Sequence, residues 1–238
     1  MDLKNRKAVV LGGTSGIGLA TVVQLEAAGA TVIAGSHSSE KFDSARTKVG
    51  EAVSFTAIDV LDRDGLRALF KAHAPFDILV NAATGGPRAA GPFLDMDLDA
   101  FQASFAKLWG YTNSVRIGCE FMSADGAIVL VSGYPARKCG PGASAISTVG
   151  NAVEGFVRAI APEIAPRRIN VVSPGIIATP MFTMEPAARD AFLAGATKGM
   201  PIPRAGKAHE VAQAILFLLQ NEFVTGTTVD VDGGALLP

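Results

Sequence analysis

The chain has 238 residues, of which 49% are hydrophobic and only 18% are charged, and its formal net charge is −1. This length suits one α/β domain with a sizeable core, and the near-neutral charge excludes the broad basic surface that nucleic acids or anionic lipids require. No apolar run reaches the length of a bilayer span, and no leader-like apolar segment precedes the first strand. We therefore expect a single domain over residues 1–238, soluble and cytoplasmic, with neither nucleic acid nor membrane as a partner.

A glycine-rich turn follows the first apolar run, Lys7–Leu11. It reads Gly12-Gly13-Thr14-Ser15-Gly16-Ile17-Gly18 and leads directly into a helix-forming stretch, Leu19–Ala28. Glycine lets the backbone turn sharply and lie against a pyrophosphate, whose charge then meets free N–H groups at the helix N-terminus. The pattern predicts a nucleotide cradle. The alternative is a plain tight turn between a strand and a helix.

Apolar runs alternate with helical patterns along the rest of the chain. Strands separated by helices imply right-handed crossovers and a parallel sheet covered on both faces. The sequence therefore predicts an α/β fold with a single Rossmann-like, doubly wound sheet of about seven strands. The predicted strands are Ala8–Leu11, Thr31–Gly35, Ala52–Ile58, Asp77–Asn81, Ala127–Ser132, Arg168–Val172 and Thr227–Val231.

The two cysteines, Cys119 and Cys139, lack the C-x-x-C or histidine-paired spacing of a zinc site or a redox dithiol. They also give no disulfide framework. We expect two buried, reduced thiols and no metal site.

The regular pattern weakens between Thr179 and Arg204, where prolines surround a short helical patch, Ala187–Ala194. Long ordered loops in compact domains are usually functional. We interpret residues 180–204 as a substrate lid. The alternative is a surface excursion with no gating role.

Short motifs follow the predicted strands, where doubly wound sheets bind their ligands. They are Gly12–Gly18, Asp59-Val60, Asn81-Ala82-Ala83-Thr84, Ser173-Pro174-Gly175, Thr179-Pro180-Met181, Thr225-Gly226 and Val231-Asp232-Gly233-Gly234. In these motifs and their order the chain resembles the short-chain dehydrogenases/reductases over nearly its whole length. Leu11 stands where that family usually has threonine, and its N-N-A-G segment is only partly kept.

The resemblance implies a nicotinamide cofactor and the residues that hold it. Asp59 and Val60 would hold the adenine ring, although Asp59 has the alternative of capping the next helix. The implied cofactor-binding residues are Gly12, Thr14, Ser15, Gly16, Ile17, Gly18, Ser36, His37, Ser38, Asp59, Val60, Asn81, Ala82, Ala83, Pro174, Gly175, Ile177 and Thr179. The family commonly forms tetramers, so the resemblance also implies a homo-oligomer, a dimer or a tetramer.

The end of the second predicted strand bears on the choice between NAD and NADP. An acidic residue there binds both ribose hydroxyls and repels a 2′-phosphate. Here the sequence is Ser36-His37-Ser38, with no carboxylate before Glu40 and with Lys41 nearby. These hydrogen-bond donors favour NADP(H) over NAD(H). The alternative is a serine cluster that caps the next helix.

The chain departs from the family at the residues that carry its chemistry. That chemistry needs a tyrosine, a lysine four residues later and a serine. Alignment places Ile146, Gly150 and Gly133 at these positions, and Lys107 at the asparagine of the usual proton relay. None of the first three residues has a side chain that can transfer a proton.

One hypothesis is that an acid/base set has been rebuilt from Tyr134, Lys107 and Ser132, in that order of preference. Tyr134 and Lys138 form a Y-x-x-x-K string with Arg137 between them, but the string falls on a loop and contains a proline, so helical spacing cannot be assumed. A tyrosine beside a cation can donate a proton to a developing alkoxide. The alternatives are an aromatic lid for Tyr134, an ion-pair partner for Lys107 and a backbone-bonding serine for Ser132.

The resemblance therefore implies an NADP(H)-dependent oxidoreductase that transfers hydride between nicotinamide and a small, largely apolar carbonyl or alcohol substrate. Two alternatives stay open. One is a nucleotide-binding protein without catalysis, acting as a sensor or partner subunit. The other is a non-redox isomerase or dehydratase. Phosphate binding and proton transfer rest on different residues, so a nucleotide pocket can persist when catalysis is lost.

Overall fold

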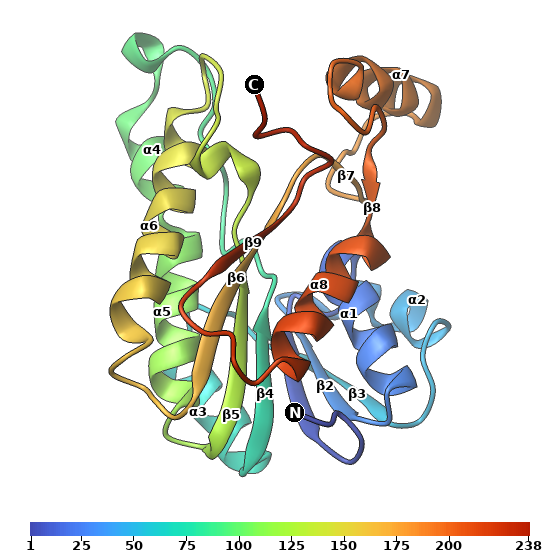
Figure 1. The fold of residues 1–238 in the computed structure, drawn as a ribbon, viewed down its shortest axis with the longest axis vertical. Coiled ribbons are helices and arrows are strands. Elements are labelled where there is room, and N and C mark those ends of the chain that lie inside the picture. Colours follow the sequence, from blue (N-terminus) through green and yellow to red (C-terminus); the bar gives the residue numbers. More distant parts are fainter.

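Seven parallel strands form the central sheet of the computed structural model, which describes residues 1–238. They are β1 (Lys7–Leu11), β2 (Thr31–Ser36), β3 (Val53–Ala57), β4 (Phe76–Asn81), β5 (Met122–Val131), β6 (Arg168–Pro174) and β9 (Thr228–Val231). Their spatial order is β3-β2-β1-β4-β5-β6-β9 (Figure 1). The doubly wound α/β fold predicted from the sequence is confirmed.

Helices cover both faces of the sheet, because successive residues of a strand point to opposite sides. In β1, Ala8 and Val10 belong to one core cluster, and Val9 and Leu11 belong to the other. The first cluster is completed by α1 (Gly16–Ala27) and α8 (Ala208–Gln220), and the second by α3 (Arg63–Ala72), α5 (Ala106–Gly118) and α6 (Ser144–Ile160) (Figure 1). No helix combines the length and apolarity needed to cross a membrane.

One group of elements stands apart from the sheet, beyond the carboxyl end of β6. It consists of helix α7 (Pro186–Thr197) and a two-stranded sheet of β7 (Ile177–Ala178) and β8 (Gly206–Lys207) (Figure 1). The helical patch was predicted, but two-residue strands leave no periodic pattern to read. The remaining elements are α2 (Phe42–Arg46), α4 (Leu98–Ala103) and the 3₁₀ turns η1 (Ser39–Lys41), η2 (Phe93–Asp95) and η3 (Tyr134–Ala136).

The prediction of two buried cysteines is wrong. Cys139 is exposed, and Cys119 is only partly buried at the C-terminus of α5. Cys139 lies in the loop after η3 rather than on a core-facing element, so nothing packs over it. No group of three or more His, Cys, Asp or Glu side chains is arranged to hold a metal ion.

Arg168, the first residue of β6, ties the C-terminus of α8 to the sheet. Its buried guanidinium donates hydrogen bonds of 2.7 Å to the carbonyl oxygens of Leu218 and Leu219, and one of 3.1 Å to that of Val224. The last carbonyls of a helix have no partner within it. Arg168 satisfies them and places a positive charge at the negative end of the helix dipole.

Replacing Arg168 should destabilise the whole domain. Arg168→Met should lower the free energy of unfolding by about 1–3 kcal/mol, because it leaves the carbonyl of Leu218 without a donor, whereas those of Leu219 and Val224 keep Met1 and Asn170. Urea denaturation measures the loss. The exposed Arg116→Met is the matched control and should change stability by less than about 1 kcal/mol. Equal effects of the two substitutions would contradict the assigned role.

Candidate active site

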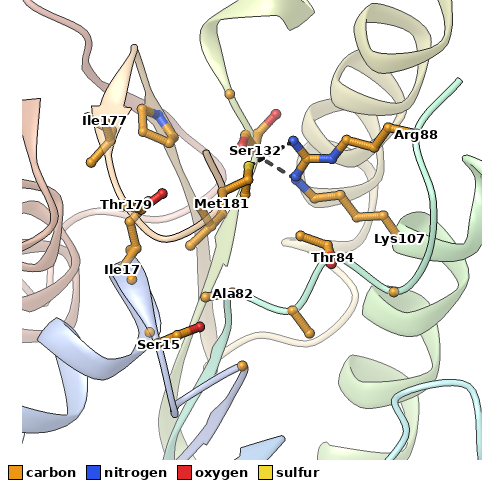
Figure 2. Close-up of a pocket in the computed structure, with 18 of the residues that line it drawn as sticks. Ser15, Ile17, Ala82, Thr84, Arg88, Lys107, Ser132, Ile177, Thr179 and Met181 are labelled. Carbon is orange, nitrogen blue, oxygen red and sulfur yellow. Dashed lines mark hydrogen bonds between the residues drawn. The ribbon is translucent and has the colours of Figure 1, made fainter. Parts of the chain in front are cut away.

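A large cavity opens at the carboxyl ends of β1, β4, β5 and β6 (Figure 2). Its volume is about 930 Å³, and 39 residues from the strand ends and the following loops line it. Ligands of doubly wound sheets bind at this edge, beside the point where the strand order reverses. That point lies between β1 and β4. The cavity is therefore the candidate site.

The glycine turn between β1 and α1 forms one end of the cavity. Gly12 has a φ of +80°, and a Cβ on it would lie 2.7 Å from the backbone nitrogen of Ala83. A Cβ on Gly18 would lie 2.0 Å from the carbonyl oxygen of Gly12. Helix α1 begins at Gly16 with no acidic side chain in its first turn. Its free N–H groups therefore fit a pyrophosphate without a competing negative charge.

All the predicted cofactor-binding residues except Ser38 and Asn81 line this cavity. The fully buried Asn81 lies behind the wall, where its Oδ1 accepts the N–H of Ala83 at 3.0 Å and its Nδ2 donates to Ser114 Oγ at 2.8 Å. It shapes the turn after β4. Ser38 Oγ accepts the N–H of Glu40 at 3.2 Å and caps η1, which is the capping role left open for this cluster.

Three polar residues from the end of β2 and from η1 line the cavity beside the glycine turn: Ser36, His37 and Lys41. Thr14 Oγ1 donates a hydrogen bond of 3.0 Å to Ser36 Oγ. This contact joins the glycine turn to the segment that would meet a 2′-phosphate. A hydroxyl, an imidazole and an ammonium group are suitable donors for such a phosphate.

Asp59 follows β3 and lines the same end of the cavity. Its Oδ2 lies 3.6 Å from His37 Nε2, and its Oδ1 accepts the N–H of Leu61 at 2.9 Å. Helix α3 is capped by a different residue, Asp62, whose side chain accepts two N–H groups of the first turn. The helix cap considered for Asp59 is thus supplied by Asp62.

Lys107 enters the opposite end of the cavity from the first turn of α5. Its ammonium nitrogen lies 3.4 Å from the carbonyl oxygen of Ser132 and 5.5 Å from the centre of the Tyr111 ring. Burial, together with the positive charge of nearby Arg88, lowers the pKa of Lys107 from its ordinary value of 10.5 to about 7. No carboxylate contributes to this shift. Lys107 therefore has no acidic partner in the structure, and the ion-pair role considered for it is not observed.

Ser132 and Tyr134 also line the cavity, at the end of β5 and in η3. The buried Ser132 Oγ donates a hydrogen bond of 3.3 Å to the carbonyl oxygen of Gly150, which matches the backbone-bonding alternative. The half-buried Tyr134 presents its ring to the cavity, and its hydroxyl forms no hydrogen bond with another residue of the chain.

The two cations that follow Tyr134 point away from the site. Arg137 forms ion pairs with Asp230 and, at 3.4 Å, with the buried Glu154. Lys138 Nζ donates a hydrogen bond of 2.7 Å to the carbonyl oxygen of Leu237. The Y-x-x-x-K string therefore does not assemble Tyr134 with a cation, because a short 3₁₀ turn replaces the helix that would align the positions.

Ile146 and Gly150, aligned with the family's tyrosine and lysine, both line the cavity. A Cβ on Gly150 would lie 2.8 Å from the Cβ of Ala136 and 3.4 Å from Ser132 Oγ. Helix α6 and η3 are therefore packed more closely than a side chain at position 150 would allow.

Arg88 and an apolar group were missed by the sequence reasoning. Arg88 lies in the loop after β4, and its Nη1 lies 3.4 Å from Met181 Sδ (Figure 2). Phe182 and Phe192 complete this wall from the segment interpreted as a lid. A cation placed in a glycine-containing loop directly after a central strand was the available signal for Arg88.

Comparisons with known proteins agree with this geometry. Residues 12–235 match the family model described as Enoyl-(Acyl carrier protein) reductase. The chain is 34% identical to the 3-oxoacyl-[acyl-carrier-protein] reductase FabG of Thermotoga maritima, over the full length of both proteins. It belongs to the short-chain dehydrogenases/reductases. Another member of this family, the L-xylulose reductase of Mesocricetus auratus, is 30% identical over 100% of this chain and 99% of its own.

Solved structures of short-chain dehydrogenases/reductases share the fold. A small-chain dehydrogenase in complex with NADPH is 31% identical, with a TM-score of 0.85 over 99% of this chain and 100% of its own. A putative β-ketoacyl-ACP reductase is 32% identical, with a TM-score of 0.85 over 98% of this chain and 99% of its own. The protein is thus an oxidoreductase of the short-chain dehydrogenase/reductase type.

The lowered pKa of Lys107 should appear in the pH dependence of stability. Between pH about 7 and 10.5 the unfolded chain binds a proton that the folded chain does not. The cost to the fold is therefore complete below about pH 7 and vanishes towards pH 10.5. Lys107→Met should raise Tm most near pH 6, and the gain should shrink by about pH 9.5.

Thermal denaturation at the two pH values tests this expectation. Lys48→Met, at an exposed lysine, is the control and should give no pH-dependent gain. A Tm gain for Lys107→Met that is the same at both pH values would mean that the ammonium is not disfavoured in the folded protein.

Proposed function

We propose that this protein is an NADP(H)-dependent oxidoreductase that interconverts a small carbonyl compound and its alcohol through an atypical active site. One observation carries the proposal. The ammonium group of Lys107, with its pKa lowered to about 7, stands in the same cavity as a cradle suited to a pyrophosphate. A group whose pKa lies near the working pH is an efficient proton donor and acceptor.

The chain's own residues would hold the cofactor and move the proton. Gly12–Gly18 would hold the pyrophosphate, and Pro174–Thr179 would hold the nicotinamide end. The nicotinamide supplies or accepts the hydride when it is bound. In reduction, Lys107 gives its proton to the carbonyl oxygen while the carbonyl carbon gains the hydride. The neutral amine of Lys107 then regains a proton from solvent.

In this proposal Lys107, rather than Tyr134, is the first candidate for proton transfer, which reverses the order of preference suggested by the sequence. Tyr134 lines the cavity, but Arg137 and Lys138 are bound to other partners and place no positive charge beside its hydroxyl. Lys107 has no carboxylate partner, so its proton is available to a substrate. Ser132 is assigned no proton transfer; its hydroxyl joins the end of β5 to α6 through the hydrogen bond to the Gly150 carbonyl oxygen.

The rates of the two directions should depend on pH in opposite ways. Reduction should fall as pH rises through about 7, because Lys107 loses its proton, and alcohol oxidation should rise over the same interval. Lys107→Met should lower kcat about 100-fold or more in both directions and remove these pH dependences. Steady-state rates between about pH 5.5 and 9 test this, with nicotinamide fluorescence showing that NADPH affinity is kept.

Tyr134→Phe is the comparison for this experiment, because it removes one hydroxyl from the same cavity. We expect a smaller loss of kcat than in Lys107→Met and an unchanged pH profile. Full turnover by Lys107→Met would eliminate the assigned proton transfer. NADPH binding by the wild-type protein without turnover of any carbonyl compound would favour the nucleotide-binding protein without catalysis.

The preference for NADP(H) is proposed from the donors at the end of β2, and it is supported by the related dehydrogenase crystallised with NADPH. Lys41→Gln should weaken NADPH binding about tenfold and leave NADH binding nearly unchanged, because one charge-assisted hydrogen bond to a 2′-phosphate is lost. Fluorescence titration with each nucleotide measures both constants. The exposed Lys48→Gln should change neither, and tighter binding of NADH than NADPH by the wild type would overturn the preference.

A further inference from the structure

Two basic side chains meet at the end of the cavity opposite the glycine turn, and no acidic side chain lies beside them there. Arg88 arrives from the loop after β4 and Lys107 from α5, and their charged ends converge near Ser132 (Figure 2). Asp59 is the only acidic residue among the 39 that line the cavity, and it lies beside His37 at the cofactor end. Neither Arg88 nor Lys107 forms a salt bridge.

The surroundings of the two cations leave their donors free for a ligand. The only hydrogen-bonding contact of the Arg88 guanidinium is with Met181 Sδ at 3.4 Å, a weak acceptor. Lys107 has one long contact, 3.4 Å to the carbonyl oxygen of Ser132. Arg88 is exposed and Lys107 is partly buried, and an anion placed between these like charges offsets their repulsion.

Apolar side chains also line this end of the cavity, together with polar ones such as Ser132. Met181, Phe182 and Phe192 face it from the segment around α7, and Ile146 and Val149 face it from α6. The site therefore combines two basic side chains with a group of apolar side chains. A ligand that matches it carries one anionic group next to its reactive atoms and a short apolar remainder.

We propose that the substrate is a short oxo-carboxylic acid, with Arg88 binding the carboxylate and Lys107 meeting the neighbouring carbonyl oxygen. This inference rests on the proposed function and names the substrate class of the same site. The fork of an arginine fits a carboxylate through two parallel hydrogen bonds. Because the charged ends of Arg88 and Lys107 converge, the carboxylate and the carbonyl group of such a substrate must lie close together.

The carboxylate also has an effect on Lys107. A bound negative charge offsets the positive charge of Arg88, which is one of the two causes that lower the pKa of Lys107. Binding of the acid therefore favours the protonated ammonium, the form that donates a proton in reduction. A neutral ketone brings no such charge.

The test compares a short apolar 2-oxo acid with its primary amide as substrates of the NADPH-loaded enzyme. We expect kcat/KM to be at least about 30-fold higher for the acid. Arg88→Gln should remove most of that preference, so that the ratio of kcat/KM for the acid to kcat/KM for the amide falls below about threefold. Arg189→Gln, at an arginine of α7 outside the lining of the cavity, should preserve the preference.

Binding of oxalate to the NADPH-loaded protein, followed by nicotinamide fluorescence, separates this inference from the proposed function. If neither substrate is turned over but oxalate binds the wild type and not Arg88→Gln, the carboxylate site stands and the reductase proposal fails. If the amide is reduced as well as the acid, or if Arg88→Gln binds oxalate as tightly as the wild type, the inference is overturned and the reductase proposal is unaffected.

Discussion

The contact between the start of α1 and the end of β1 is the constraint on which the rest of the site depends. Gly18 lies so close to the carbonyl of Gly12 that a methyl group cannot be placed there, and a methyl group on Gly12 would lie only 2.7 Å from the backbone nitrogen of Ala83. These approaches bring the first turn of α1 and the loops after β1 and β4 to one point. The helix dipole, the strand ends and the loop that carries Arg88 then share one cavity.

The electrostatics of the cavity follow from this placement. The end beside the glycine turn holds hydroxyls, His37, Lys41 and one carboxylate, whereas the opposite end holds Arg88 and Lys107 beside apolar side chains. Folding buries Lys107 and brings Arg88 beside it, and the two effects together lower the pKa of Lys107 and cost stability. A pKa perturbed in this way in a cleft is typical of functional sites.

Most of the fold could be predicted from the sequence, because long apolar strands buried on both faces leave a strong pattern. The end of β1, the glycine turn and the residues after β3, β4 and β6 were placed correctly for the same reason. The sequence does not show in which direction an individual side chain points. Arg137 and Lys138 looked like partners of Tyr134 until ion pairs and C-terminal carbonyls were seen to hold them elsewhere.

Arg88 escaped notice because its role depends on a contact between distant segments. Nothing in the sequence near position 88 indicates that α5 will bring Lys107 beside it, or that Met181 will be its neighbour. Asn81 and Ser38, in contrast, were predicted to bind the cofactor but do not line the cavity. Both stand in the expected motifs, but their side chains are used for the turn after β4 and for the cap of η1.

The close packing of Gly150 against Ala136 makes the present arrangement hard to reverse. Introducing a lysine at position 150 would require η3 to move, and η3 is held in place by the bond from Asn151 to the Ala136 carbonyl and by the ion pairs of Arg137. A side chain at position 150 could therefore enter the cavity only by displacing the segment that carries Tyr134.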